Sequence, residues 1–225
     1  VWEAQAQLDA KVSASTDTRK IYKFDPSNSS TVNTNLKQFL WANLSPSSAT
    51  ADVCSIAKEQ ACFNFKGINL NQYATNNLTT AQKALADSGE NVVNWLRGQT
   101  QWEGSVDSAE RAFRDREHVL GDAVNATPAY VRAPVFNFED AVTPRYKDGV
   151  GNFRDANVAR LGVLYIAAND GTLHAFDGED GQELWAYVPR IVYPELHKLA
   201  TDSWSTAHKY YVDGSPQVAD AFIGT

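Results

Sequence analysis

VLYIAANDGTLHAFDGEDGQELWAYV, residues 163–188, contains three short apolar runs separated by two turn sequences. The first turn, NDG at residues 169–171, is typical of a tight hairpin. The second, DGEDG at residues 177–181, offers two glycines for positive φ. Short apolar runs bounded by Gly and Asp indicate strands rather than helices. The stretch therefore predicts a three-stranded antiparallel meander.

The second half of the chain differs from the first in its pattern. From Val119 onward the apolar runs are short and β-branched, and Gly, Asp and Pro separate them, which is typical of strands. Before that point apolar residues recur at helical spacing, as in the segment 36–44. We therefore expect residues 1–118 to form a helical and loop segment and residues 119–225 to be mainly β.

A weak internal repeat supports a repeating β architecture. NATPAYV at residues 125–131 is echoed by DGSPQV at residues 213–218, and in both a hydroxyl residue precedes a Pro at the start of an apolar segment, where a strand tolerates Pro. Pro128 and Pro216 are 88 residues apart, whereas propeller blades recur at about 40–50 residues. A blade between them must then carry an insertion, for which residues 132–160 are the candidate.

Composition excludes several classes of protein. Hydrophobic residues make up 43% of the 225 residues and include six Trp, which is enough for a packed core. A formal net charge of −7 argues against a nucleic-acid-binding surface, and no run reaches the roughly 18 apolar residues of a membrane span. Because the chain starts at Val1 and contains no Met, we expect a piece of a longer protein whose native sequence continues past Thr225.

The chain contains two cysteines, Cys54 and Cys62. On a straight helix their separation corresponds to about 12 Å, beyond the roughly 4.4–6.8 Å Cα spacing of a disulfide, so a bridge requires the segment to fold back. With no third Cys or His nearby, the pair is a poor zinc site. Two interpretations stay open here, a disulfide or two unpaired buried thiols in a cytosolic protein.

Residues 163–185 resemble the tryptophan-docking blade motif that quinoprotein-type β-propellers share. The residues that carry the motif are Asn169, Asp170, Gly171, Ala175, Asp177, Gly181 and Trp185. In such a blade the glycines shape two hairpins, and the tryptophan lies flat against a neighbouring blade and buries roughly 150–250 Å² of aromatic surface. The resemblance implies a partial β-propeller with quinoprotein-like blades and says little about chemistry.

The flanking segments narrow the resemblance to one family. In chain order they are NVVNWLRG at 91–98, FRDR at 113–116, VLGDAVNATP at 119–128 and, after the blade motif, KYYVDGSP at 209–216. This series resembles the C-terminal propeller domain of the PilC/PilY class of type IV pilus tip proteins. The resemblance implies a non-enzymatic bacterial protein, exported through the periplasm to the outer membrane and pilus tip, that supports pilus extension, surface adhesion and twitching motility.

The same resemblance implies partners and a redox compartment. The implied partners are pilus tip (minor pilin) proteins and host or abiotic surface ligands, with no nucleic acid and no membrane span. Export also favours the disulfide between Cys54 and Cys62.

The sequence offers no convincing catalytic or metal-binding set. The four histidines lack an acid and a nucleophile at suitable spacing, and we expect His174 to pack within the blade and Asp122 to cap a turn. Residues 177–183 do not have the register of an EF-hand loop. We therefore assign no catalytic residue, metal ligand or cofactor within this chain, and expect any Ca²⁺ that the family binds to lie elsewhere in the full-length protein.

Two alternative functions share the propeller. A quinone-dependent dehydrogenase uses the same docking motif, but it needs a cofactor pocket on the propeller axis, a catalytic Asp and Ca²⁺, and often adjacent cysteines. An outer-membrane assembly scaffold grips partner proteins with regular blades. The chain has no adjacent cysteine pair, and its expected insertion and helical preface are unlike the scaffold, so a pilus-tip module is the leading hypothesis.

Overall fold

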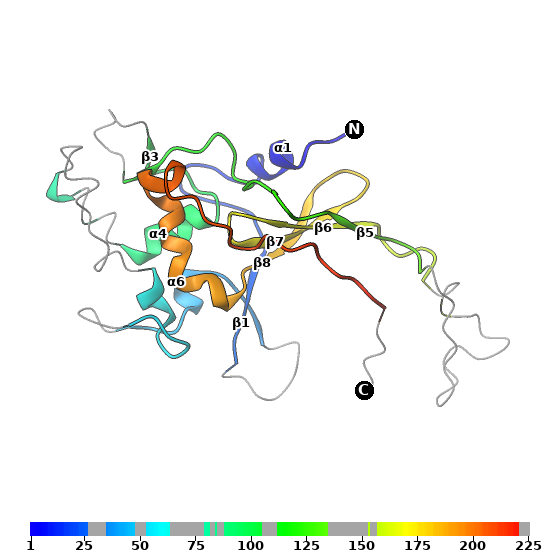
Figure 1. The fold of residues 1–225 in the computed structure, drawn as a ribbon, viewed down its shortest axis with the longest axis horizontal. Coiled ribbons are helices and arrows are strands. Elements are labelled where there is room, and N and C mark those ends of the chain that lie inside the picture. The colour runs from blue at the N-terminus through cyan, green and yellow to red at the C-terminus, as the bar shows by residue number, and fades with distance from the viewer. Residues whose placement is uncertain are drawn as a thin grey trace.

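The computed structural model of the chain describes residues 1–26, 35–47, 53–63, 79–81, 84, 88–104, 112–134, 153 and 157–220 (Figure 1). Its main feature is a six-stranded sheet with the order β2-β1-β8-β7-β6-β5. The strands of this sheet are β1 Ile21–Phe24, β2 Leu36–Gln38, β5 Ala129–Val131, β6 Val163–Ala168, β7 Thr172–Asp177 and β8 Glu183–Tyr187. A separate parallel pair joins β3 Glu103–Gly104 to β4 Phe113–Arg114.

Short helices accompany the sheet, so the fold is mixed α/β. The α-helices are α1 Ala4–Asp9, α4 Gly89–Leu96 and α6 Tyr193–Leu196. The 3₁₀ turns are η2 Trp41–Asn43, η3 Glu59–Cys62, η5 Arg190–Val192, η6 His197–Ala200 and η7 Asp202–Ser205. In Figure 1, α4 and α6 lie together at one end of the sheet, and the edge strand β5 lies toward the opposite end.

The predicted meander is confirmed. β6, β7 and β8 pair antiparallel in sequence order, and β5 pairs antiparallel with β6. Gly171 (φ 87°) and Gly181 (φ 77°) adopt the left-handed backbone in the two turns, a conformation that glycine tolerates because it has no Cβ. The expected insertion near 132–160 lies almost entirely outside the described residues.

The N-terminal part contributes strands, which the sequence pattern did not indicate. β1 pairs in parallel with β8, and β2 pairs antiparallel with β1. The expectation of a helix over 36–44 is wrong, because that segment begins as strand β2 and then forms the single turn η2. Pairing with a long-range partner overrides local helical spacing here. The domain division at residue 118 stays a prediction, although the sheet includes strands from both sides of it.

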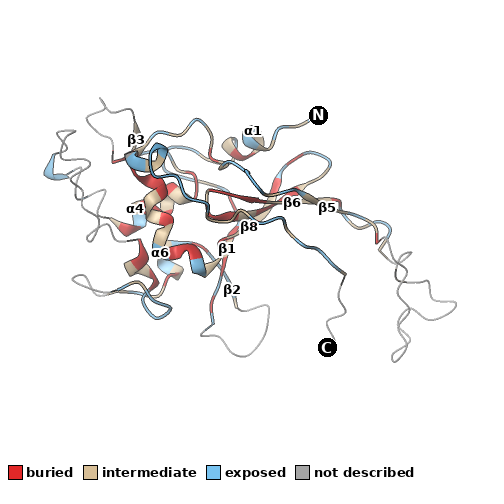
Figure 2. Cartoon of the chain, in the orientation of Figure 1, coloured by how far each residue is buried: buried red, intermediate tan, exposed pale blue. Residues whose placement is uncertain are grey.

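The two faces of the sheet have different environments. Paired residues in neighbouring strands point to the same face, so the covered face carries Ile21, Lys23, Phe176, His174 and Ala186, all of which are buried. The open face carries larger side chains that are only half-buried or exposed: Tyr22, Phe24, Leu36, Tyr165, Leu173, Trp185 and Tyr187. Figure 2 shows the buried residues concentrated where α4, α6 and the sheet meet.

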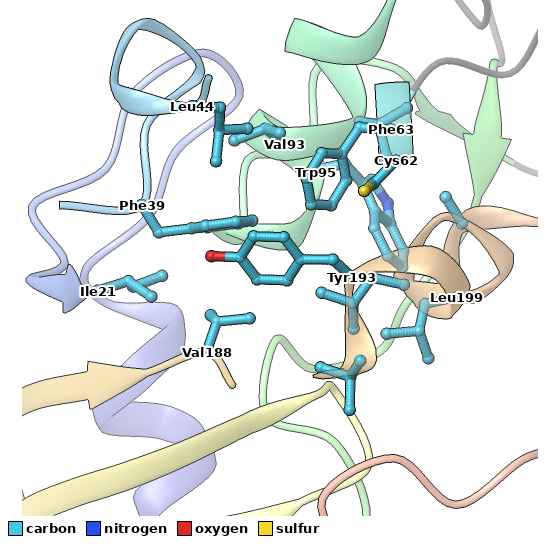
Figure 3. Packing of buried hydrophobic residues seen from close by; sticks show 14 of the residues in the cluster. Ile21, Phe39, Leu44, Cys62, Phe63, Val93, Trp95, Val188, Tyr193 and Leu199 are labelled. Atoms are coloured by element: carbon cyan, nitrogen blue, oxygen red, sulfur yellow. The ribbon is translucent and has the colours of Figure 1, made fainter. Parts of the chain in front are cut away.

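The larger core cluster is aromatic at its centre. Figure 3 shows Phe39, Phe63 and Tyr193 converging, with ring centroids 5.4–5.6 Å apart. Cys62 packs in the same cluster and forms a disulfide with Cys54, with the two Cα atoms 4.5 Å apart. The short η3 turn lets the segment fold back, which a straight helix would not allow.

Substitution of Gly171 by alanine is expected to destabilise the fold. A Cβ at this position would lie 2.2 Å from Cδ2 of the buried Leu196, and the positive φ disfavours a side chain. We expect Gly171→Ala to lower the free energy of unfolding by about 1–3 kcal/mol in urea denaturation. The matched control is Gly214→Ala, where a Cβ would meet nothing within 4 Å and the change should stay within about 0.5 kcal/mol. Equal effects of the two substitutions would contradict the conclusion that Gly171 is required by its positive φ and its contact with Leu196.

Candidate functional site

A charged cluster is buried on the covered face of the blade motif. His174 is fully buried between two carboxylates. Its Nδ1 lies 2.9 Å from Oε1 of Glu183, and its Nε2 lies 2.9 Å from Oδ2 of Asp170. Asp170 also accepts hydrogen bonds from the backbone N–H groups of Gly121 and Thr172. These bonds tie the first hairpin of the meander to its last strand and to the segment that precedes β5.

Arg19 completes this cluster from the N-terminal part. Its Nε and Nη2 donate to the two oxygens of Glu183 at 2.9 and 2.8 Å, and both side chains are buried. Its Nη1 donates to the carbonyl of Arg97 at 3.0 Å, while Arg97 pairs with Asp17. We call Arg19, Asp170, His174 and Glu183 the ionic cluster. It joins segments more than 160 residues apart.

The ionic cluster stabilises its own charges. Burial disfavours a charged imidazole, but Asp170 and Glu183 together raise the pKa of His174 to about 9. Burial likewise favours a protonated carboxyl, but the hydrogen bonds from Arg19 and His174 lower the pKa of Glu183 to about 2. At neutral pH His174 is therefore a cation that donates from both ring nitrogens. This arrangement suits a structural ion network rather than a general base.

Asn169 connects three segments. Its backbone N–H donates to the carbonyl of Asp122 at 2.9 Å, and its Nδ2 donates to the Asp122 carboxylate at 3.1 Å. Its Oδ1 accepts from the N–H of Tyr211 at 3.3 Å. Asp122, which we expected to cap a turn, instead bridges to Asn169 and lies 3.3 Å from His208. These contacts hold the first turn of the meander against residues of both flanks.

The other motif residues shape the hairpins and the open face. Ala175 is fully buried between its pairing partners Tyr165 and Trp185. Those two rings lie 5.8 Å apart, and both are half-buried. The Asp177 carboxylate accepts from the N–H of Glu179 within the second turn.

Trp2 packs on the second turn. A Cβ on Gly181 would lie 2.4 Å from the indole ring of Trp2, and the Trp2 Nε1 donates to the carbonyl of Gly178 at 3.4 Å. Trp2 also faces Phe176, with ring centroids 6.4 Å apart. The indole of Trp2 is therefore held on the second turn by packing on Gly181 and by its hydrogen bond to Gly178.

A groove of about 410 Å³ lies beside the ionic cluster. Its lining includes Asn169 and Asp170 of the blade motif together with Trp95, Arg114 and Trp204.

Side chains that commonly bind metal ions do not cluster among the described residues. These residues contain no group of three or more His, Cys, Asp or Glu side chains that could hold a metal ion, so we derive no role for Ca²⁺ in this part of the molecule. No helix among the described residues is long and apolar enough to cross a membrane.

Comparison with known proteins identifies the family. The PilY1 β-propeller domain matches residues 120–225. Over its whole length the chain is 34% identical to the type IV pilus biogenesis factor PilY1 of Pseudomonas aeruginosa PAO1. The chain belongs to the PilY1 family. A PilY1 homologue of Xylella fastidiosa is 35% identical over 74% of the chain and 13% of its own length.

The chain covers a small part of its PilY1 relatives. It spans 16% of the length of the PAO1 protein, and the PilY1 of P. aeruginosa UCBPP-PA14 is 33% identical over 99% of the chain and 16% of its own length. No solved structure matches the chain.

Sequence reasoning missed part of the site in this PilY1-family chain. His174 was expected to pack, and it is buried, but its pairing with two carboxylates was not anticipated. Arg19 was not singled out at all, since no local pattern marks a residue whose partner lies 164 positions away. Arg114 was noted only within the FRDR segment at 113–116, and the packing of Trp2 on Gly181 was not anticipated.

Removal of the His174 cation is expected to have a pH-dependent effect. The folded-state pKa of His174 is about 9, above its ordinary value of 6.5, so its contribution to stability is complete below pH 6.5 and is lost as pH rises through 9. The contribution of Glu183 to stability is complete above pH 4.5 and is lost only as pH falls toward its folded-state pKa of about 2. We expect His174→Gln to cost about 3–5 kcal/mol near pH 5.5, because Asp170 loses its ion-pair partner and the buried Glu183 keeps only Arg19, and less at pH 9.5.

Urea unfolding across this pH range provides the measurement. His208→Gln serves as the control, because His208 is exposed and its pair with Asp122 should contribute at most about 1 kcal/mol. A loss for His174→Gln that does not change between pH 5.5 and 9.5 would contradict a buried imidazolium.

Proposed function

We propose that the chain forms part of the β-propeller of a type IV pilus biogenesis factor and carries one complete four-stranded blade, β5 to β8. Two observations support the repeating architecture. The backbone N–H of Asn125 donates to Asp213, and that of Thr127 donates to Ser215. Each pair is 88 residues apart, which equals the spacing of the repeated Pro128 and Pro216. The two repeat segments therefore lie side by side, run in the same direction and keep a constant register.

The open face supports the same architecture. A sheet that is buried on one face and lined by half-buried aromatic side chains on the other is suited to pack between neighbours. Residues 217–220 already line a hollow next to Val163 and Tyr165. We propose that a following blade begins at the second repeat and covers this face, with Trp185 seated on that blade as Trp2 is seated on Gly181.

The role we propose is non-enzymatic and belongs at the cell surface. The observation that carries it is the 34% identity over the whole chain to a protein named as a type IV pilus biogenesis factor. On this basis the full-length protein acts at the outer membrane or pilus tip, contacts minor pilins and surface ligands, and supports pilus extension, adhesion and twitching motility. Any Ca²⁺ it uses binds in another part of the protein.

The relatives favour this proposal over the two alternatives. Those that match over most of the chain are named for pilus biogenesis, rather than as quinone-dependent dehydrogenases or outer-membrane assembly scaffolds. The ionic cluster agrees with a structural platform, because its buried charges already have partners within the chain.

Truncation of Trp185 in the full-length protein tests the covered open face. If a neighbouring blade buries the indole, Trp185→Ala should lower the free energy of unfolding by about 3–5 kcal/mol. If the indole stays half-exposed, the loss should be about 1 kcal/mol or less. Pulse proteolysis in urea measures the difference. Ile191→Ala is the control, since Ile191 is 87% exposed and its truncation should be nearly neutral.

The pilus role is tested by localisation and motility. Antibody raised against residues 91–225 should label the ends of sheared surface fibres in immunogold electron microscopy, and deletion of the gene should reduce surface pili and twitching zones. Complementation with the native gene is the control. Unlabelled fibres together with quinone-dependent dye reduction by the full-length protein would favour the dehydrogenase instead.

A further inference from the structure

Arg114 differs from the other arginines that the structure describes. Each of the others has a carboxylate oxygen within 4.0 Å: Arg19, Arg97, Arg116, Arg132, Arg160 and Arg190. No carboxylate of the described residues lies that close to Arg114. Arg116, two residues along the chain, is paired with Glu103.

The surroundings of Arg114 hold its side chain in place and leave donors free. Its Nε donates to the carbonyl of Leu199 at 2.6 Å, and its Nη1 makes a long bond of 3.3 Å to the carbonyl of Asp115. Its guanidinium carbon lies 5.3 Å from the ring centroids of both Trp95 and Trp204. Within the described part of the chain Nη2 donates to no group. Two carbonyls and two indoles therefore position the guanidinium of Arg114, and its Nη2 can donate a hydrogen bond to a ligand.

No described carboxylate forms an ion pair with Arg114, and only longer-range attraction to Glu103, Asp122 and Asp115 offsets its charge. Burial and the positive charge of Arg116 lower the pKa of Arg114 to about 10, which still leaves it charged at neutral pH. A partly desolvated cation without a counter-ion is costly. An anion that approaches the free nitrogen would therefore be stabilised.

The groove beside Arg114 has room for a ligand and indicates its charge. Its volume is about 410 Å³, and its walls combine the two indoles with aliphatic side chains such as Leu96, Leu120 and Leu199. The groove is also lined by acidic and basic side chains: Glu117, Asp122, Asp170, Arg116 and His118. The three carboxylates repel a multiply charged anion such as phosphate more strongly than a singly charged one. A single carboxylate with apolar groups next to it fits both the cation and the walls.

We propose that Arg114, Trp95 and Trp204 form a binding site for one carboxylate of a peptide segment, which carries aliphatic side chains beside its acidic group. The guanidinium donates charge-assisted hydrogen bonds to the carboxylate, and the indoles and leucines cover the neighbouring side chains. The site does not depend on the proposed pilus role, since it rests on the geometry of these residues alone.

A pair of isosteric peptides tests the site on the full-length protein. The probes are acetyl-Leu-Glu-Leu-amide and its neutral counterpart acetyl-Leu-Gln-Leu-amide, with glucuronate as a third ligand, and saturation-transfer NMR titration measures their dissociation constants. We expect the Glu peptide to bind at least about tenfold more tightly than the Gln peptide, because only it can form the charged hydrogen bonds. Equal binding of the two peptides, or binding of neither, overturns the proposal. Tighter binding of glucuronate than of the Glu peptide overturns the assignment to a peptide.

Substitutions locate the binding to Arg114. Arg114→Gln should remove the tenfold preference for the Glu peptide, and Arg114→Lys should restore part of it, because lysine keeps the charge and loses the fork. Arg132→Gln is the matched control, since Arg132 is exposed and 3.8 Å from Glu179, and it should leave the preference unchanged. A preference that survives in a folded Arg114→Gln protein, as judged by near-UV circular dichroism, overturns the proposal. The comparison of the two peptides on the native protein decides the matter even if that variant fails to fold.

Discussion

The bidentate pair between Arg19 and Glu183 is the contact on which the arrangement of the chain depends. Both side chains are buried, so neither charge can be left to water, and removal of one partner would leave an uncompensated charge in the core. Glu183 also receives His174, which in turn binds Asp170. One chain of charged contacts thus fixes the N-terminal segment, the first hairpin and the last strand of the meander at the same place. Such a network specifies register because a shifted strand would leave several buried charges unpaired at once.

This constraint explains how strands from the start of the chain come to extend the blade. With Arg19 anchored, the chain that follows it runs alongside β8, and β1 forms a parallel pair there. A further buried ion pair joins Lys23 in β1 to Glu59 in η3 and so ties this strand to the segment that contains the disulfide. The edge of β8 is covered by this addition, which removes an exposed row of backbone groups from that side of the sheet. The open face then remains as the large apolar surface of the sheet.

The arginines of this molecule fall into two kinds, those that form ion pairs within the fold and Arg114, which we propose binds a ligand. Arg19, Arg97 and Arg116 each meet an acid from the chain itself, and their role is complete within the fold. Arg114 instead contacts backbone carbonyls and two indoles. A guanidinium that is positioned without being neutralised is preorganised for an external anion, because the cost of ordering it has already been met during folding.

The sequence by itself determined the features that depend on neighbouring residues. The meander and its turns followed from NDG and DGEDG, since turn conformation is decided by the residues within the turn. The family followed from motifs in a fixed order. The tertiary structure alone decided the partner of Arg19, the strand at Ile21–Phe24 and the seat of Trp2. The segment 36–44 shows why: its apolar spacing fits a helix, but its backbone pairs with β1, and a partner chosen by long-range packing leaves no mark in local periodicity.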